Sequence, residues 1–114
     1  MGDSSPLTPT VFHILLALEG GPLHGYAIMK QVEAEAGLQM GPGTIYGSIQ
    51  RLRQAGWLAE AGAVEGQSAQ STERRRGKAF ELTPEGRAAL TDEARRIRRL
   101  AAHATVERLV SDGA

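Results

Sequence analysis

The sequence GPGTIYGSIQRLRQAGWL, residues 41–58, joins a turn-forming tripeptide directly to a helical pattern of apolar residues. Ile45, Ile49 and Leu52 recur at helical spacing, which places their side chains on one face of a helix. Gly56 follows the last periodic position and marks the end of that helix. The stretch therefore predicts an amphipathic helix that begins at Gly-Pro-Gly and keeps its polar side chains on the other face.

The start of this helix has features that suit a phosphate group. A helix N-terminus exposes unpaired backbone N–H groups and the positive end of the helix dipole, and both favour an anion. Pro42 preorganises the first turn, and Gly43 leaves room for a sugar-phosphate backbone to approach the main chain. Thr44 adds a hydroxyl group beside them. We therefore expect this helix end to lie against a nucleic-acid backbone.

The polar face of the same helix carries side chains that recognise bases. Arg and Gln form bidentate hydrogen bonds with guanine and adenine edges in the major groove. A small residue within the face would let the helix lie deep in that groove. An ordinary amphipathic helix with a solvated polar face is the alternative for this helix taken alone. The outward-facing residues are Tyr46, Gly47, Gln50 and Arg53, with Arg51 beside them.

Two other helices precede this one and are expected to pack in the same core. Leu-Thr-Pro occurs at residues 7–9 and again at 82–84, and Thr followed by Pro is a strong helix start. The first start predicts a helix over residues 9–18, and a four-residue apolar repeat predicts a second helix over residues 25–36. Because only a few residues separate the second helix from the third, the pair forms a helix-turn-helix unit.

A β-hairpin follows the third helix. Residues 57–59 and 79–82 are expected to form short strands, and the polar residues 62–77 between them form a protruding loop. The segment 57–83 is called the wing below. A cluster of basic residues at its tip suits phosphate or minor-groove contact, although such a run is usually a solvated loop. The cluster consists of Arg74, Arg75, Arg76 and Lys78.

The last helix is expected to be one continuous element from Pro84 to about Val110. Its apolar residues alternate spacings of four and three, which is typical of a helix that packs along another helix. A single small domain has no need of so long an apolar helix, so we expect contact with a second copy of the chain. The predicted dimer contacts are Leu90, Ala94, Ile97, Leu100, Ala101, Ala104 and Leu109, with Val106 and Val110 on a second apolar side.

Composition limits the functions that remain. The 114-residue chain carries a formal net charge of +0 and contains no cysteine, so disulfides and thiolate chemistry are excluded. The three histidines do not sit at metal-ligand spacing, and no Ser, Asp or Gly-rich pattern suggests an active site or a nucleotide pocket. We expect no cofactor, no metal, no enzymatic activity and no membrane contact. The N-terminal residues lack a secretory signal pattern, which favours a cytoplasmic protein.

The sequence resembles the PadR family of bacterial transcriptional regulators, which share a winged helix-turn-helix fold. The resemblance lies in HGYAIMKQVEAEAG at 24–37, GPGTIYGSIQRLRQAGWL at 41–58 and RRRGKAFELTPEGR at 74–87, and it covers roughly residues 7–90. The single C-terminal helix resembles that of the shorter subgroup, in which it makes the dimer. By position, the resemblance implies DNA contacts from Tyr26, Pro42, Gly43, Thr44, Tyr46, Gln50 and Arg51, and wing contacts from Arg74, Arg75, Arg76 and Lys78.

The chain departs from the family pattern at several positions of the expected DNA-binding face. Gly41 stands where serine is usual, so one helix-capping hydroxyl is missing. Gly47 stands where proline is usual, and Arg53 replaces a frequent acidic residue. Ala79-Phe80 replaces an aromatic pair that often contains Tyr. No aromatic residue follows Phe80, which argues against an aromatic-stacking pocket between two C-terminal helices.

These observations predict a mostly α-helical protein with a small β-hairpin. Its organisation is an N-terminal tail over residues 1–6, a winged helix-turn-helix domain over 7–83 and a dimerisation helix over 84–114. The leading hypothesis is a homodimeric repressor that binds a pseudo-palindromic DNA operator, with a small-molecule effector of unknown identity. The alternative is a winged-helix adaptor that binds protein and not DNA, since a fold alone does not fix a function. The acid-free third helix and the basic wing favour the DNA-binding hypothesis.

Overall fold

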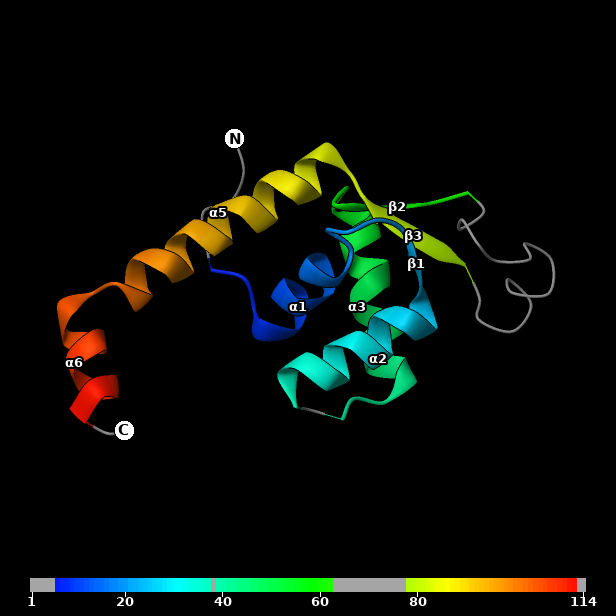
Figure 1. Ribbon diagram of the computed structural model, residues 1–114. Coiled ribbons are helices and arrows are strands. Elements are labelled where there is room, and N and C mark those ends of the chain that lie inside the picture. The colour runs from blue at the N-terminus through cyan, green and yellow to red at the C-terminus, as the bar shows by residue number, and fades with distance from the viewer. Residues whose placement is uncertain (1–5, 38, 63–77, 113–114) are drawn as a thin grey trace.

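The computed structural model describes residues 6–37, 39–62 and 78–112. Helices dominate the chain, and the described strands form one small sheet (Figure 1). This confirms the predicted mostly helical winged helix-turn-helix fold. The elements are α1 (Pro9–Ala17), β1 (Leu23–His24), α2 (Gly25–Ala36), α3 (Pro42–Gln54), β2 (Leu58–Glu60), β3 (Ala79–Leu82), α5 (Pro84–Ala101) and α6 (Ala104–Asp112).

The core lies where α1, α2 and α3 converge beneath the sheet. Each helix contributes apolar residues at helical spacing, so its buried face follows from the sequence pattern. Thr8 caps α1 as predicted, because its hydroxyl accepts a hydrogen bond from the backbone N–H of Val11 at 3.2 Å. The least exposed side chains of the core are Ile14, Leu15, Leu18, Ile28, Val32, Ile45 and Ile49.

The helix-turn-helix unit is closed by a glycine at the end of α2. Gly37 adopts φ 69°, a left-handed conformation that few residues other than glycine accept. Its backbone N–H donates to the carbonyl of Glu33 at 3.0 Å, which completes the last turn. The chain can therefore reverse toward α3 within a few residues, and both helices keep one face in the core.

The sheet has a third strand that the sequence analysis did not predict. Its strand order is β1-β3-β2, and Leu23 pairs with Phe80 while His24 pairs with Ala79. A two-residue strand leaves no alternation pattern to detect. His24 is buried in β1, directly before the start of α2. This strand ties the wing to the helix-turn-helix unit.

The predicted hairpin is confirmed in its two strands. Leu58 pairs with Leu82 and Glu60 pairs with Phe80, both in antiparallel register. Residues 63–77, including Arg74, Arg75 and Arg76, lie outside the described residues. Trp57 is half-buried and packs at the edge of the core. The backbone carbonyl of Trp57 lies so close to Gly86 of α5 that a Cβ atom there would overlap it.

The prediction of one continuous C-terminal helix was wrong. Helix α5 ends at Ala101, and α6 begins at Ala104 after a break at Ala102 and His103. The ring Nδ1 of His103 accepts a hydrogen bond from the backbone N–H of Thr105 at 3.1 Å. This bond gives the backbone a local partner that competes with the continuing helical pattern. Helix α6 consequently turns away from the axis of α5 (Figure 1).

Helix α5 is anchored to the body through a buried carboxylate. Glu93 is only 6% exposed, and its carboxylate accepts hydrogen bonds from Arg96 at 2.6 and 3.0 Å. The hydrogen bonds from Arg96 and from the backbone of Leu7 hold the pKa of Glu93 below its ordinary value, although burial opposes this. Leu90 is also buried and packs in the core of its own chain. The free apolar surface of α5 therefore begins after Leu90.

Candidate nucleic-acid interface

Helix α3 divides into a buried face and an exposed face, as its sequence predicts. Ile45, Ile49 and Leu52 are each at most 6% exposed. Ser48 joins them, although the sequence analysis did not place it in the interior. Across the helix, Thr44, Tyr46, Gln50 and Arg51 are exposed. The exposed face carries hydroxyl, amide and guanidinium groups and no acidic residue.

The N-terminus of α3 is open to solvent. Gly41 occupies the capping position without a side-chain hydrogen bond, as the missing serine predicts. Pro42, Gly43 and Thr44 are exposed, and a Cβ atom at Gly43 would meet nothing within 4 Å. A backbone or phosphate could thus approach the first turn closely.

Two tyrosines lie in the N-terminal turns of α2 and α3. The ring of Tyr46 packs so closely against Gly25 that a Cβ atom at Gly25 would overlap it. Tyr26 is 46% exposed, and the ammonium of Lys30 lies 5.6 Å from its ring centroid. The starts of α2 and α3 thereby present both phenolic side chains at the surface, with a cation beside one of them.

Arg51 bends back along α3. Its Nη2 donates a hydrogen bond to the hydroxyl of Ser48 at 3.2 Å. Its Nη1 would lie 3.7 Å from a Cβ atom at Gly47, an ordinary contact distance. The absence of a side chain at Gly47 leaves the guanidinium space to lie against the helix. The remaining donors of Arg51 are available to an acceptor outside the chain.

Arg53 connects α3 to both strands of the wing. Its Nη2 donates to Oε2 of Glu60 at 2.9 Å, and Nζ of Lys78 donates to the same oxygen at 3.1 Å. The guanidinium also lies 5.7 Å from the ring centroid of Phe80. Hydrogen bonding by Lys78, together with the charge of Arg53, holds the pKa of Glu60 below its ordinary value. Glu60 is therefore an anion that two cations share.

Sequence reasoning did not identify Glu60. Its partners are 7 and 18 positions away, and they meet it only through the strand register. Lys78, which was predicted as a wing contact, is exposed and held by this carboxylate. The only sequence signal was an acidic residue at the end of the first strand.

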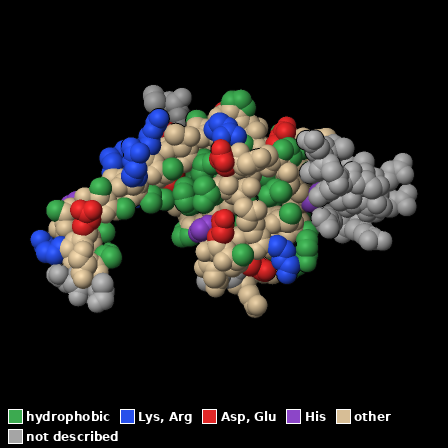
Figure 2. All heavy atoms as spheres, in the orientation of Figure 1, with side chains coloured by type: hydrophobic (Ala, Val, Ile, Leu, Met, Phe, Trp, Pro, Cys, Tyr) green, Lys and Arg blue, Asp and Glu red, His purple; other side chains and the backbone are tan. Residues whose placement is uncertain are grey.

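The predicted dimer contacts separate into one buried and six exposed residues. Leu90 belongs to the core, as described above. Ile97 is 40% exposed, Leu100 48% and Leu109 67%, which are high values for large apolar side chains. Figure 2 places a patch of hydrophobic side chains beneath α5, beside α1. The other exposed members of the set are Ala94, Ala101 and Ala104.

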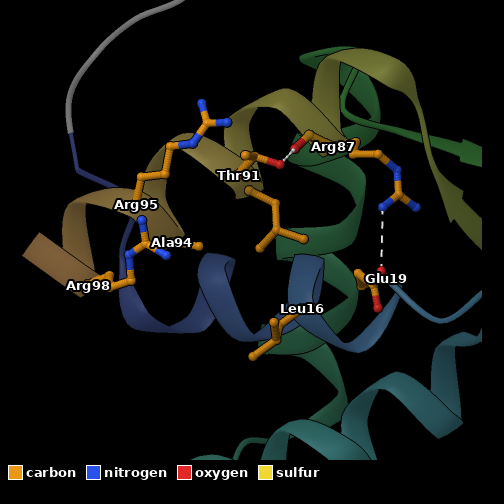
Figure 3. Close-up of a pocket in the computed structure, with 8 residues that line it drawn as sticks. Leu16, Glu19, Arg87, Thr91, Ala94, Arg95 and Arg98 are labelled. Carbon is orange, nitrogen blue, oxygen red and sulfur yellow. Dashed lines mark hydrogen bonds and ion pairs between the residues drawn. The ribbon is translucent and has the colours of Figure 1, made fainter.

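A cavity of about 530 Å³ lies between α1 and α5 (Figure 3). Leu16, Leu90 and Ala94 give it an apolar floor. At one end, Arg87 forms an ion pair of 3.6 Å with Glu19. Arg95 and Arg98 extend from α5 at the other end, so positive charge exceeds negative charge around the opening.

Two other classes of site find no support within the described ranges. Residues 6–37, 39–62 and 78–112 contain no cluster of three or more His, Asp or Glu side chains that could hold a metal ion. No helix in those ranges is long and apolar enough to cross a bilayer.

Comparison with known proteins places the chain among regulators. The model of the Transcriptional regulator PadR-like family matches residues 14–92. The chain is 34% identical over 90 residues to the transcriptional regulator Rv3488 of Mycobacterium tuberculosis, covering 78% of this chain and 76% of the relative. It is 38% identical over 87 residues to an uncharacterised 37.1 kDa protein of transposon TN4556 from Streptomyces fradiae, covering 76% of this chain and 22% of that protein.

The fold comparison agrees with the sequence comparison. The crystal structure of Bacillus subtilis PadR in complex with operator DNA matches with a TM-score of 0.55 and 25% identity. The match covers 72% of this chain and 44% of the B. subtilis chain. Because the family model spans most of the chain, including α3 and both wing strands, the resemblance expected from the sequence is confirmed. The chain belongs to the PadR-like family of transcriptional regulators.

Proposed function

We propose that this regulator binds double-stranded DNA sequence-specifically, with α3 in the major groove and the wing beside it. The observation that carries the proposal is the exposed face of α3, which offers hydroxyl, amide and guanidinium groups without an acidic residue. A major groove about 12 Å wide accepts a helix of this kind. The complex of the B. subtilis relative with operator DNA supports the same partner here.

The contacts divide by chemistry. Gln50 and Arg51 stand on the exposed face in the C-terminal half of α3, and we assign them to base edges. Gly43 and Thr44 stand at the helix start, where backbone groups suit a phosphate. Tyr46 lies between these two sets on α3 and Tyr26 lies at the start of α2, and we assign both to sugar-phosphate contact. In the wing we assign phosphate contact to Arg74, Arg75 and Arg76 and to Lys78. A protein-binding adaptor would have little use for this concentration of donors, which disfavours that alternative.

We propose further that the regulator acts as a homodimer. Ile97, Leu100 and Leu109 would otherwise leave a large apolar surface in water. A two-fold dimer places its recognition helices about one DNA turn apart, so the operator is a pseudo-palindrome with half-sites ~10 base pairs apart or a multiple of that. Within this proposal, residues 7–83 bind DNA and residues 84–114 hold the dimer.

The regulatory outcome we propose is repression within the cytoplasm. A dimer seated on an operator that overlaps a promoter blocks access to it. The cavity between α1 and α5 suits a small effector, because it joins an apolar floor to Arg95 and Arg98. An amphipathic carboxylate fits that combination. Because α5 joins the DNA-binding body to the dimer contacts, a ligand there could change the spacing of the two recognition helices.

Binding titrations at several salt concentrations test the central proposal. A pool of duplexes with a randomised segment supplies the preferred site. Each phosphate neutralised adds about 0.9 to the slope of log K against log salt, so we expect a slope near ~6 or steeper for the dimer. A slope near zero would favour the adaptor alternative and end the DNA-binding proposal.

Variants then separate base contacts from phosphate contacts. Gln50→Ala or Arg51→Ala should weaken the preferred site by ~1–3 kcal/mol and relax preference at one position. Replacing Arg74, Arg75 and Arg76 with Ala should instead weaken all sequences to similar degrees. If the α3 variants lost the same binding free energy on specific and on random DNA, α3 would contact only the DNA backbone.

A further inference from the structure

A chain of polar contacts runs from the wing to the exposed face of α3. Oε2 of Glu60 accepts from Arg53 Nη2 at 2.9 Å and from Lys78 Nζ at 3.1 Å. On its other side, Arg53 Nη1 donates to Oε1 of Gln50 at 3.2 Å. The guanidinium of Arg53 also lies over the ring of Phe80, 5.7 Å from its centroid, which limits the directions in which it can point. Glu60 thus acts on Gln50 through a single arginine.

The chemistry of arginine fixes which atom of Gln50 faces it. A guanidinium has five N–H donors and no acceptor. The atom of the Gln50 amide that lies toward Arg53 is therefore the oxygen, and the two N–H donors of Nε2 point elsewhere. Since Gln50 is exposed, those donors are the part of the amide that a base can meet.

This orientation matters because the bases differ in their major-groove edges. Adenine offers an N6 donor and an N7 acceptor, so a bidentate contact requires both the oxygen and the nitrogen of a glutamine. Guanine offers acceptors at both N7 and O6, and thymine offers an acceptor at O4. The amide oxygen has two lone pairs, and Arg53 occupies one of them and draws the oxygen toward itself. The outward part of the amide is then mainly a donor, which complements an acceptor edge better than the mixed donor and acceptor edge of adenine.

We infer that Glu60 is a positioning residue that sets the base preference of α3, by holding Arg53 against Gln50 so that Gln50 recognises guanine or thymine and discriminates against adenine. The inference rests on the proposed DNA-binding function and specifies the base class at one operator position. Glu60 touches no base itself. Its carboxylate affects the choice of base indirectly, because it holds Arg53 and Arg53 orients the amide of Gln50.

The same contacts restrain positive charge. While Glu60 engages Arg53 and Lys78, both cations are less available to phosphates. Removing the carboxylate releases them, so binding to random DNA should tighten. The slope of log K against log salt should steepen by about 0.9 for each cation that gains a phosphate. Specificity and non-specific affinity are therefore expected to change in opposite directions in the same variant.

The first experiment locates the position that Gln50 contacts. The site selected from randomised duplexes by the unaltered protein is compared with the site selected by Gln50→Ala. We expect one position in each half-site to relax, with guanine or thymine there in the original selection. Substituting 7-deazaguanine at that position removes N7, which weakens binding if the base is guanine and the contact uses N7. Adenine at the relaxed position, or no relaxed position, overturns the inference.

The second experiment tests the role of Glu60 itself. Glu60→Ala should reduce the preference over adenine at that position by roughly 5-fold or more, the discrimination expected of one good base contact. Preferences at the other positions should stay unchanged. The matched control is Glu81→Ala, which deletes an exposed acid on β3 whose carboxylate makes no hydrogen bond or ion pair among the described residues. A loss of preference in both variants would point to net charge and overturn the positioning role.

A second variant guards against unfolding. Arg53→Met keeps an unbranched aliphatic side chain on α3 but cannot donate to Gln50. It should lose the same preference as Glu60→Ala, and the double variant should lose no more than either, because the two residues act in series. Unchanged preference in a folded Arg53→Met variant refutes the inference and leaves the DNA-binding proposal intact. Failure of the unaltered protein to bind any duplex refutes the DNA-binding proposal first, and this inference with it.

Discussion

The winged helix-turn-helix body buries its large apolar residues, whereas the C-terminal helices expose several of theirs. In the body, Ile14, Ile28 and Ile45 are 0% exposed. In the C-terminal helices, Leu109 and Val110 are more than 60% exposed, although their side chains are as apolar. Helix α6 follows α5 after the break and stands away from the core, and its side chains at residues 104–111 are exposed (Figure 1). The body buries its apolar residues within one chain, whereas the C-terminal helices leave theirs exposed, as the proposed dimer requires.

This difference bears on how the two regions are stabilised. A nine-residue helix such as α6 is marginal by itself in water, because helix nucleation costs more than a short helix returns. The helices of the body are stabilised by tertiary packing, since all three contribute to one core. Losses in the body should therefore appear as unfolding, and losses in the C-terminal helices should appear as dissociation.

Truncating a core residue should have the largest effect. Ile14→Ala leaves a cavity in a fully buried site and should lower the free energy of unfolding by ~2–5 kcal/mol in urea titrations. The matched variant Leu109→Ala removes a similar side chain from an exposed site. At concentrations where the protein is monomeric, it should stay within about 0.5 kcal/mol of the unaltered chain. Similar losses in both variants would mean that α6 packs in the monomer.

Charge on the exposed face of α5 should separate the two copies. Ile97→Glu with Leu100→Glu would place carboxylates in the proposed apolar contact, where they lack partners. Because both positions are about half exposed in the monomer, the helical signal in circular dichroism should persist. We expect a monomer in light scattering and operator affinity lowered by roughly 100-fold, as two linked half-sites become independent. A dimer of unaltered affinity would contradict the proposed interface.

The smallest effect on stability is expected from the carboxylate of Glu93, and it should appear only at acidic pH. The pKa of Glu93 is depressed in the folded chain, so its contribution is present above the unfolded value near 4.5 and is lost as pH falls through the folded value. Glu93→Gln should therefore flatten the dependence of stability on pH below about 4.5. Thermal melts across that range measure it. A variant whose melting temperature falls as steeply in acid would exclude Glu93 as the source.

The sequence predicted the parts of the fold that depend on local periodicity. The three body helices and the buried face of α3 follow from apolar spacing, and both Thr-Pro starts act as caps. Strand β1 was missed because two residues carry no pattern. The break before α6 was missed because neither of its residues, Ala102 and His103, is a glycine or a proline. The hydrogen bond from the backbone N–H of Thr105 to the ring of His103 depends on how that side chain is oriented, which the sequence does not reveal.

The candidate site was predicted less completely than the fold. Exposed residues of α3 could be assigned from helical geometry, because position along a helix determines the face. The link from Glu60 to Gln50 could not be assigned, because it depends on how the wing strands approach the end of α3. Hydrogen bonds between elements that are distant in sequence produce no local pattern from which a single sequence could predict them.

The close packing of Tyr46 on Gly25 has a consequence for how this surface can evolve. Any side chain at position 25 would displace the tyrosine ring, and with it a group that we assign to DNA contact. The two positions are therefore expected to vary together. Among related chains, a larger residue at position 25 should accompany a smaller one at position 46, so this part of the surface is expected to change by paired substitutions.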